Sequence, residues 1–495
     1  MQTRSVSLTI IRLSLLAVMA ISWPQHVTAQ ETAADGGQPT DQQNQPAADT
    51  PDGDVENDPA NPQVTDEERE QMLNTMEEWR QTLLYGIKSE ILELFPTLIE
   101  NQETELIPDV IELFESSNDS ELLAAAADYL TTVESSDGQA RAQELLQAGE
   151  RTAADLPISL MNYLRDTEAE LEDETVEALL EIATTGATRE ADSAVQLLGA
   201  SEEVPSALLV ELYQDQFVSG EIRGRILIEL GRRGDPDVYD FVSEIIQEGE
   251  EAQTTLQRYA IDTLGKLGDP RALPTILSQF DSSDAMTRAY AVNALTSFDT
   301  PEANRALVDS LRDDFWRVRV AALETIAERE MTDAAPAVMY KARRDPERRV
   351  RLEAIKTVAV LDHEEGWELL RERFQEDRTA VDERGAIADE LIRHNLEQSM
   401  DTILEVMERE WDEENSRLLD TIGRIISQVD DPRIEPIASR YIDHPNFILQ
   451  IYGLRAVASS RLTGLTDIAE ARQEEGNHRA VRRAALRALE EIGAQ

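Results

Sequence analysis

Apolar residues recur at helical spacing through most of the chain. From residue 201 onwards they fall at i, i+3 and i+4 positions in pairs of segments, and each segment has room for about 12 to 14 residues. The second segment of each pair is marked by a large apolar anchor, and successive anchors from Leu227 to Ile355 lie 34, 31, 31 and 32 residues apart. The anchors are Leu227, Ile261, Val292, Leu323, Ile355, Ile422, Leu454 and Leu486, with Ile387 in a weaker unit. No alternating strand pattern accompanies them, so we predict an all-α fold, an α-α superhelix of about ten helical-hairpin repeats.

A phrase that occurs twice predicts how the helices end and begin. Leu, Gly, two further residues, Gly, Asp and Pro follow one another from Leu230 and again, thirty-four residues later, from Leu264. Glycine ends a helix because it adopts the left-handed conformation without a Cβ clash, and proline opens the next helix because its missing N–H costs nothing there. A period of this length is typical of a solenoid.

The units resemble HEAT repeats, in particular the short variety found in phycobilisome-lyase-like proteins. Proline recurs in their first helix, at Pro274, Pro336 and Pro436. An aspartate stands six residues before an arginine twice, as Asp313 with Arg319 and as Asp345 with Arg351. In that family the two residue types form a ladder between neighbouring units. The resemblance therefore implies a structural role for these four side chains, and we expect Asp345 and Arg351 to interact.

The first residues predict export. Arg4 and Arg12 precede an apolar run that ends at Ile21, and the small residues up to Ala29 offer a cleavage site. These features are typical of a secretory signal peptide, and hence of a protein of the periplasm or the extracellular space. An uncleaved anchor is the alternative, but the run is much shorter than the roughly 20 residues that span a bilayer.

Composition divides the rest of the chain. The stretch after the signal peptide is rich in Gln, Pro, Ala and Asp, contains no Lys or Arg, and cannot bury enough apolar surface to order itself. We therefore predict a signal peptide, an acidic disordered linker, an N-terminal cap with divergent helical repeats, and HEAT-like repeats, at residues 1–29, 30–65, 66–200 and 201–495.

The net charge of −53 argues against nucleic acid as a partner, because phosphate binding needs basic stripes. Residues 30–222 hold 45 acids and 7 bases, whereas residues 223–495 hold 54 acids and 37 bases. The one dense basic cluster consists of Arg343, Arg344, Arg348, Arg349 and Arg351. Pairing with the ladder and with acidic neighbours would explain it, and a docking patch for an acidic partner is the alternative.

The sequence offers few residues that could act in catalysis or bind a metal. The chain has no cysteine, and its five histidines, His26, His363, His394, His444 and His478, are scattered singly. One His-Glu pair begins at His363, where the di-iron hydroxylases among HEAT-like proteins need four such pairs. We find no nucleophile elbow, phosphate loop or zinc-protease motif. The sequence therefore predicts no catalytic residue, no metal ligand, no cofactor and no enzymatic activity.

The favoured function is an exported protein–protein interaction scaffold that binds a periplasmic or envelope partner. Second helices line the inner surface of HEAT-like stacks, so the exposed positions beside the anchors form a candidate stripe: Asp262, Asn293, Glu324, Lys356 and Arg455. A catalytic or regulatory relative of the lyase-like or di-iron HEAT proteins is the alternative, and a structural spacer without a tight partner is a third reading. Arginines of the last helix, including Arg483 and Arg487, are expected to face solvent on its outer side.

Overall fold

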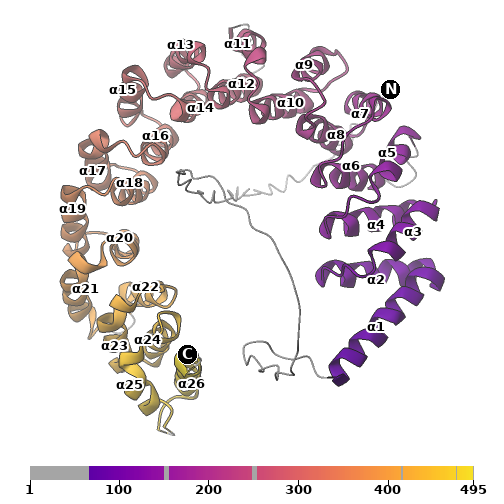
Figure 1. Cartoon of the computed structure of the whole chain (residues 1–495). Coiled ribbons are helices and arrows are strands. Elements are labelled where there is room, and N and C mark those ends of the chain that lie inside the picture. Colours follow the sequence, from indigo (N-terminus) through magenta and orange to yellow (C-terminus); the bar gives the residue numbers. More distant parts are fainter. Residues whose placement is uncertain (1–65, 150–154, 248–253, 414–415, 475, 494–495) are drawn as a thin grey trace, which may run out of the picture. The chain divides into compact units, whose positions relative to one another are not determined.

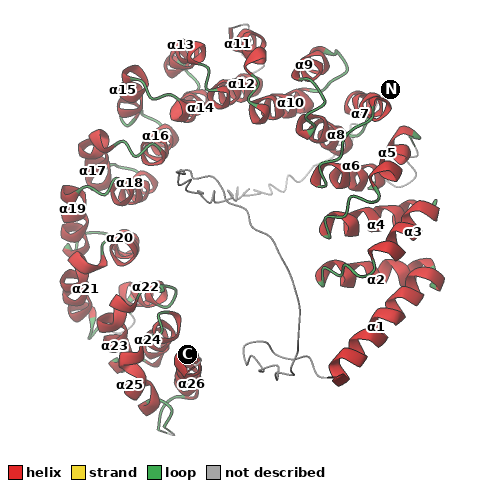
Figure 2. Ribbon diagram, in the orientation of Figure 1, coloured by secondary structure: helices red, strands yellow, loops and turns green. Residues whose placement is uncertain are grey.

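The computed structural model describes part of the chain, namely residues 66–149, 155–247, 254–413, 416–474 and 476–493. These residues belong to one compact unit that begins at Asp66. Within the described ranges there are twenty-six α-helices, a few short 3₁₀ helices and no strand (Figures 1 and 2). The predicted all-α repeat fold is confirmed. The predicted signal peptide and acidic linker lie outside the described residues, so export stays a prediction.

Consecutive helices pair as hairpins, and each even-numbered helix also packs against the next even-numbered helix. The even-numbered helices form one layer of the array, which we call the inner row (Figure 1). It consists of α2 (Lys88–Glu100), α4 (Ser120–Thr132), α6 (Leu156–Asp166), α8 (Thr188–Ala200), α10 (Gly220–Arg233), α12 (Thr254–Leu267), α14 (Ala285–Ala294), α16 (Trp316–Glu328), α18 (Arg348–Val360), α20 (Val381–His394), α22 (Arg417–Ile426), α24 (Phe447–Ser459) and α26 (Arg479–Gly493).

The odd-numbered helices form the second layer, the outer row. It consists of α1 (Asp66–Tyr85), α3 (Ile107–Ser116), α5 (Gln139–Gln147), α7 (Asp173–Thr185), α9 (Ser206–Gln214), α11 (Tyr239–Gln247), α13 (Leu273–Ser278), α15 (Pro301–Ser310), α17 (Ala335–Arg344), α19 (Glu364–Gln375), α21 (Leu396–Glu410), α23 (Glu435–Asp443) and α25 (Thr466–Ala471). Among the described residues the two rows make thirteen hairpins, four of them before residue 201, where the sequence pattern is weakest.

The nine sequence anchors fall one to each inner-row helix from α10 to α26. Eight of them, from Leu227 to Leu454, are fully buried, because an inner-row helix packs on both of its neighbours and on its outer-row partner. Leu486 is the exception and is 50% exposed, while Ala485 and Ala488 are buried in its place. Of the described inner-row helices α26 packs against α24 alone, so the anchor side of α26 has no second neighbour.

Glycine and proline separate the hairpins as the repeated phrase predicts. Gly234 ends α10 in the left-handed conformation, with φ of 64°, and its N–H donates to the carbonyl of Leu230. Asp235 then accepts a hydrogen bond from the N–H of Asp237, and Pro236 opens a 3₁₀ turn that leads into α11. Since proline lacks an N–H, the first turn of a helix is where it is tolerated best.

Candidate functional site

A buried ion pair joins the hairpin of α16 to the hairpin of α18. Nε and Nη2 of Arg319 donate to the two carboxylate oxygens of Asp345 at 2.9 and 2.8 Å. Nη1 of the same arginine donates to the main-chain carbonyl of Asp313 at 2.8 Å. The side chains of Arg319 and Asp345 are 6% and 0% exposed. The arginine therefore fixes the turn of its own hairpin and the turn of the next one at once.

The same arrangement recurs along the array. Equivalent arginine–carboxylate pairs from one hairpin to the next are Arg258 with Asp284, Arg288 with Asp313, Arg351 with Glu383, and Arg384 with Glu410. We call this series the ladder. The ladder joins residues about one repeat apart, and the two residues six positions apart within one hairpin are not side-chain partners.

The expected interaction between the side chains of Asp345 and Arg351 is therefore wrong. Arg351 donates to the main-chain carbonyl of Asp345 at 2.8 Å, and its ion pair is with Glu383 at 2.6 Å. The carboxylate of Asp345 already accepts hydrogen bonds from Arg319, because the packing of α16 on α18 brings these two side chains together. The signal in the sequence was the spacing of 26 residues from each arginine to the next aspartate, which Arg319 and Asp345 share with Arg258 and Asp284.

Hydrogen bonds within the ladder lower the pKa of two of its carboxylates. Burial alone would raise the pKa of Asp345, but hydrogen bonds from Arg319, the N–H of Glu347 and Lys341 outweigh burial and lower it. The pKa of Asp313 is lowered in the same way, against its burial, by Arg288 and the N–H of Phe315. Asp345 and Asp313 are thus held as ionised carboxylates with their hydrogen bonds satisfied, which is the arrangement that buried charge requires. The ladder accounts for these residues structurally.

The predicted stripe lies on the inner row, with one residue on each of α12, α14, α16, α18 and α24. Asn293, Glu324, Lys356 and Arg455 are exposed, and Asp262 is half-buried. Asp262 pairs with Lys266 at 2.8 Å and Lys356 with Glu353 at 3.2 Å, both within one helix. The stripe runs over four successive helices, then resumes on α24 beyond α20 and α22. It offers separated charges of both signs and no single convergent centre.

The arginine-rich turn between α17 and α18 is largely engaged by the chain itself. Arg343 pairs with Glu372 at 3.0 Å, Arg348 pairs with Asp382, and Arg349 lies 4.8 Å from the centre of the Trp316 ring. Arg344 is exposed and makes no ion pair within the described ranges. The acids that bind this turn come from the following hairpin, one repeat later. Pairing explains most of the cluster, and the docking-patch alternative is left with Arg344 alone.

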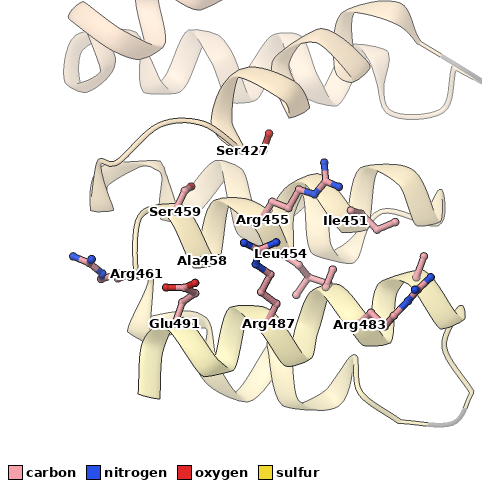
Figure 3. Close-up of a pocket in the computed structure, with 12 residues that line it drawn as sticks. Ser427, Ile451, Leu454, Arg455, Ala458, Ser459, Arg461, Arg483, Arg487 and Glu491 are labelled. Atoms are coloured by element: carbon pink, nitrogen blue, oxygen red, sulfur yellow. The ribbon is translucent and has the colours of Figure 1, made fainter. Parts of the chain in front are cut away.

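A groove of about 700 Å³ lies between α24 and α26, beside the end of α22 (Figure 3). Four arginines and one glutamate are among the twelve residues that line it: Arg455, Arg461, Arg483, Arg487 and Glu491. Ile451, Leu454, Ala458, Ala480 and Ala484 supply an apolar part of the wall, and none of the twelve is aromatic. Within the described ranges, none of these four arginine side chains makes an ion pair or a hydrogen bond.

This groove corrects one expectation from the sequence. Arg483 and Arg487 are exposed, as expected, but the side of the last helix is not the expected outer one: they line the groove together with Arg455 of the preceding inner-row helix (Figure 3). The available signal was local charge, because residues 451–495 hold seven arginines against six acids in a chain with more than twice as many acids as bases.

Comparison with known proteins identifies the array. The profile of a family described as spirochaete HEAT repeat protein matches residues 83–488, which is most of the chain. The chain belongs to this HEAT-repeat family. A comparison with curated protein sequences gave no match.

A comparison with solved structures gave matches to this HEAT array at low sequence identity. Kap95p in complex with RanGDP has 12% identity and a TM-score of 0.41, over 88% of this chain and 73% of Kap95p. Kap121p bound to the extreme C-terminus of the phosphatase Cdc14p gives the same identity and TM-score, over 88% of this chain and 55% of Kap121p. The CpcE–CpcF phycocyanin lyase complex from Nostoc sp. has 16% identity and a TM-score of 0.29, over 59% of this chain and 94% of that chain.

Histidines of the HEAT array lie apart from one another. His444 is buried against the Trp411 ring, with centroids 4.5 Å apart, and its ring accepts a hydrogen bond from the N–H of Asn446. In the predicted His-Glu pair, Glu364 forms an ion pair with Arg371 at 3.0 Å. Within the described ranges no group of three or more histidines and carboxylates is placed to hold a metal ion, and no helix is long and apolar enough to cross a membrane.

One inner-row carboxyl has a strongly shifted pKa. Burial on α20 and, to a smaller extent, the neighbouring charge of Asp389 raise the pKa of Glu390 to about 7, while Lys356 opposes the rise. Partial desolvation on α16 also raises the pKa of Glu324. Perturbed carboxyls often mark functional surfaces, but a packed polar cluster shifts pKa values too. The inner row between α16 and α20 is therefore a surface whose charge depends on pH.

Proposed function

We propose that this HEAT-repeat protein is an exported interaction scaffold whose inner row holds a partner protein of the periplasm or envelope. The proposal rests mainly on one observation, the polar positions on four successive inner-row helices from the half-buried Asp262 on α12 to the exposed Lys356 on α18. A HEAT-repeat solenoid supports a protein-interaction role, because its stacked helices form an extended binding surface. Export is supported by the basic, apolar and small-residue order of residues 1–29.

Charge on the inner row defines the partner in part. Asp262 and Glu324 are acidic and lie on α12 and α16, whereas the basic Lys356 and Arg455 lie on α18 and α24. The partner's surface should therefore be polar and carry complementary charges of both signs. Exposed charges are screened by salt, and the Debye length is about 8 Å at physiological ionic strength. Association should therefore weaken as salt is added, mainly through a slower on-rate.

Site-specific photo-crosslinking in the native envelope tests the proposal. A photoreactive residue is placed at Asn293 or Glu324 on the inner row, and at Asp309 or Tyr340 on the outer row as matched exposed controls. The scaffold proposal predicts that both inner-row positions yield the same crosslinked protein and that the outer-row positions do not. Adducts that form only at the outer row, or equally at both rows, would contradict it. Protease accessibility of the full chain in intact cells tests export separately.

A further inference from the structure

The groove between α24 and α26 differs from the rest of the molecule in how its arginines are used. Along the ladder each arginine meets a carboxylate of the next hairpin, as Arg319 meets Asp345 at 2.8 Å. In the groove, the side chains of Arg455 and Arg487 make no ion pair or hydrogen bond within the described ranges, although the chain carries 99 acids. A guanidinium presents five N–H donors in a planar fork that matches a carboxylate. The guanidinium groups of Arg455 and Arg487 are therefore available to bind a ligand.

Like charges are also concentrated there. Arg483 and Arg487 stand four residues apart on α26, so their side chains share one helix face and repel each other. Arg455 comes to the same groove from α24, and Arg461 from the turn that follows it. Glu491 is the one acid among the lining residues. An anion bound between the two helices would relieve this repulsion, which the folded chain by itself leaves in place.

The residues that line the groove limit which kind of anion could bind there. Leu454 and Ala484 contribute apolar surface between the arginines, which suits an aliphatic side chain flanked by carboxylates. Proteins that bind single-stranded nucleic acid stack bases on aromatic side chains, and no lining residue of this groove is aromatic. The lining is confined to α24, the turn after it, α26 and the end of α22, so the groove offers little length to a long polyanion. The features together favour a short segment.

We infer that this groove binds an acidic peptide segment of a partner protein, with the carboxylates on the four arginines and an apolar side chain against the wall. The inference deepens the proposed function and rests on it, because it names the kind of segment that the scaffold would hold. Arg455 is the one stripe residue in the groove, so the groove extends the inner-row surface towards α26.

Fluorescence anisotropy of the full chain with a labelled peptide, in which glutamates flank a central leucine, tests the inference. The test variant is Arg483→Gln with Arg487→Gln. The matched control is Arg189→Gln with Arg479→Gln, which removes the same charge from two exposed arginines that do not line the groove. Losing two charge-assisted contacts should weaken peptide binding about tenfold or more, and the control about twofold or less. Arg455→Gln alone should weaken binding by an intermediate factor, which covers the case in which the double variant fails to fold.

Several outcomes would overturn the inference. They are equal binding of the glutamine version of the peptide, equal binding by the test variant, and tighter arginine-dependent binding of a single-stranded oligonucleotide or of inorganic phosphate than of the peptide. Self-association that depends on Arg483 and Arg487, without peptide binding, would assign the groove to a second copy. Failure of peptide binding with the inner-row crosslinks at Asn293 and Glu324 retained would reject the groove and leave the scaffold proposal standing. Loss of those crosslinks with peptide binding intact would reject the inner row as the partner-binding surface and leave the groove as a peptide site.

Discussion

Arg319 donates two hydrogen bonds, at 2.9 and 2.8 Å, to Asp345, which lies in the next hairpin of the chain. Neither side chain is more than 6% exposed, so the pair is shielded from solvent and salt. The aspartate also accepts a hydrogen bond from the N–H of Glu347, which fixes the turn that starts α18. One ion pair thereby sets the relative position of two inner-row helices, and with them the spacing between Glu324 and Lys356 on the binding surface.

Removing one partner of this pair should be costly. Asp345→Ala leaves the Arg319 guanidinium buried without its carboxylate, and breaking a buried pair in this way costs about 3–5 kcal/mol of unfolding free energy. Asp309→Ala removes an exposed pair with Arg312 and should cost less than about 1 kcal/mol. Urea denaturation of Asp345→Ala, Arg319→Ala and the double variant measures the coupling. Strictly additive losses would mean that the two side chains are energetically independent.

Close packing between α12 and α14 depends on a glycine. A Cβ atom at Gly265 would lie 2.7 Å from the Cα atom of Ala294, so the clash is with backbone that cannot rotate away. Gly265→Ala should therefore destabilise the array by about 1–3 kcal/mol. Gly220→Ala, at the open first turn of α10, has no atom within 4 Å of the new Cβ and serves as control. If thermal melting shows both variants equal to wild type, α12 and α14 are not this close.

Several inner-row helices end in a left-handed residue that is not glycine. Glu330 follows α16 with φ of 47°, a conformation that strains a side chain with a Cβ. Glu330→Gly should stabilise the chain by about 0.5–1 kcal/mol, because the relief of strain exceeds the extra entropy of the unfolded chain. Glu328→Gly, two residues earlier and helical, should destabilise by a similar amount. Melting temperatures that move in the same direction for both variants would contradict this assignment.

The raised pKa of Glu390 predicts a pH-dependent stability. Burial raises its pKa from 4.5 to about 7, so between these values the folded chain holds a proton that the unfolded chain has lost. This glutamate therefore lowers stability as pH rises through that window, and its penalty is complete above about pH 7. Glu390→Gln should raise the melting temperature more at about pH 8 than at about pH 5. Glu302→Gln, exposed on α15, should show no such difference, and a parallel pH profile for both variants would refute the shift.

The repeat fold could be predicted because its signals are local. Anchors from Leu227 to Leu454 recur at the repeat spacing, and burial at that spacing requires no knowledge of the partner helix. Leu486 followed the same spacing but is exposed, because burial there depends on a neighbouring helix and not on periodicity. Glycine ends such as Gly234 could also be predicted, whereas Glu330 could not, since strain at a left-handed residue leaves no trace in composition.

The candidate site could be predicted only in part. Stripe positions such as Lys356 follow from the anchor beside them and lie on the inner row. Partners from different hairpins are harder to assign, since Asp345 has an arginine six residues later and another 26 residues earlier and binds the side chain of the earlier one. The groove combines Arg455 with Arg487 of another helix, and only the packing of α24 on α26 brings them together.

The central claim is that the inner row binds the partner, and charge reversal measures this most directly. Glu324→Lys with Lys356→Glu inverts two inner-row charges and conserves net charge, and Asp309→Arg with Arg312→Asp does the same on the outer side of the array. Affinity is measured for the protein captured by the inner-row crosslinks, with folding followed by circular dichroism. The account predicts that the inner-row swap weakens binding by about tenfold or more and that the outer swap changes it by about twofold or less. Full-strength binding by a folded inner-row variant would contradict it.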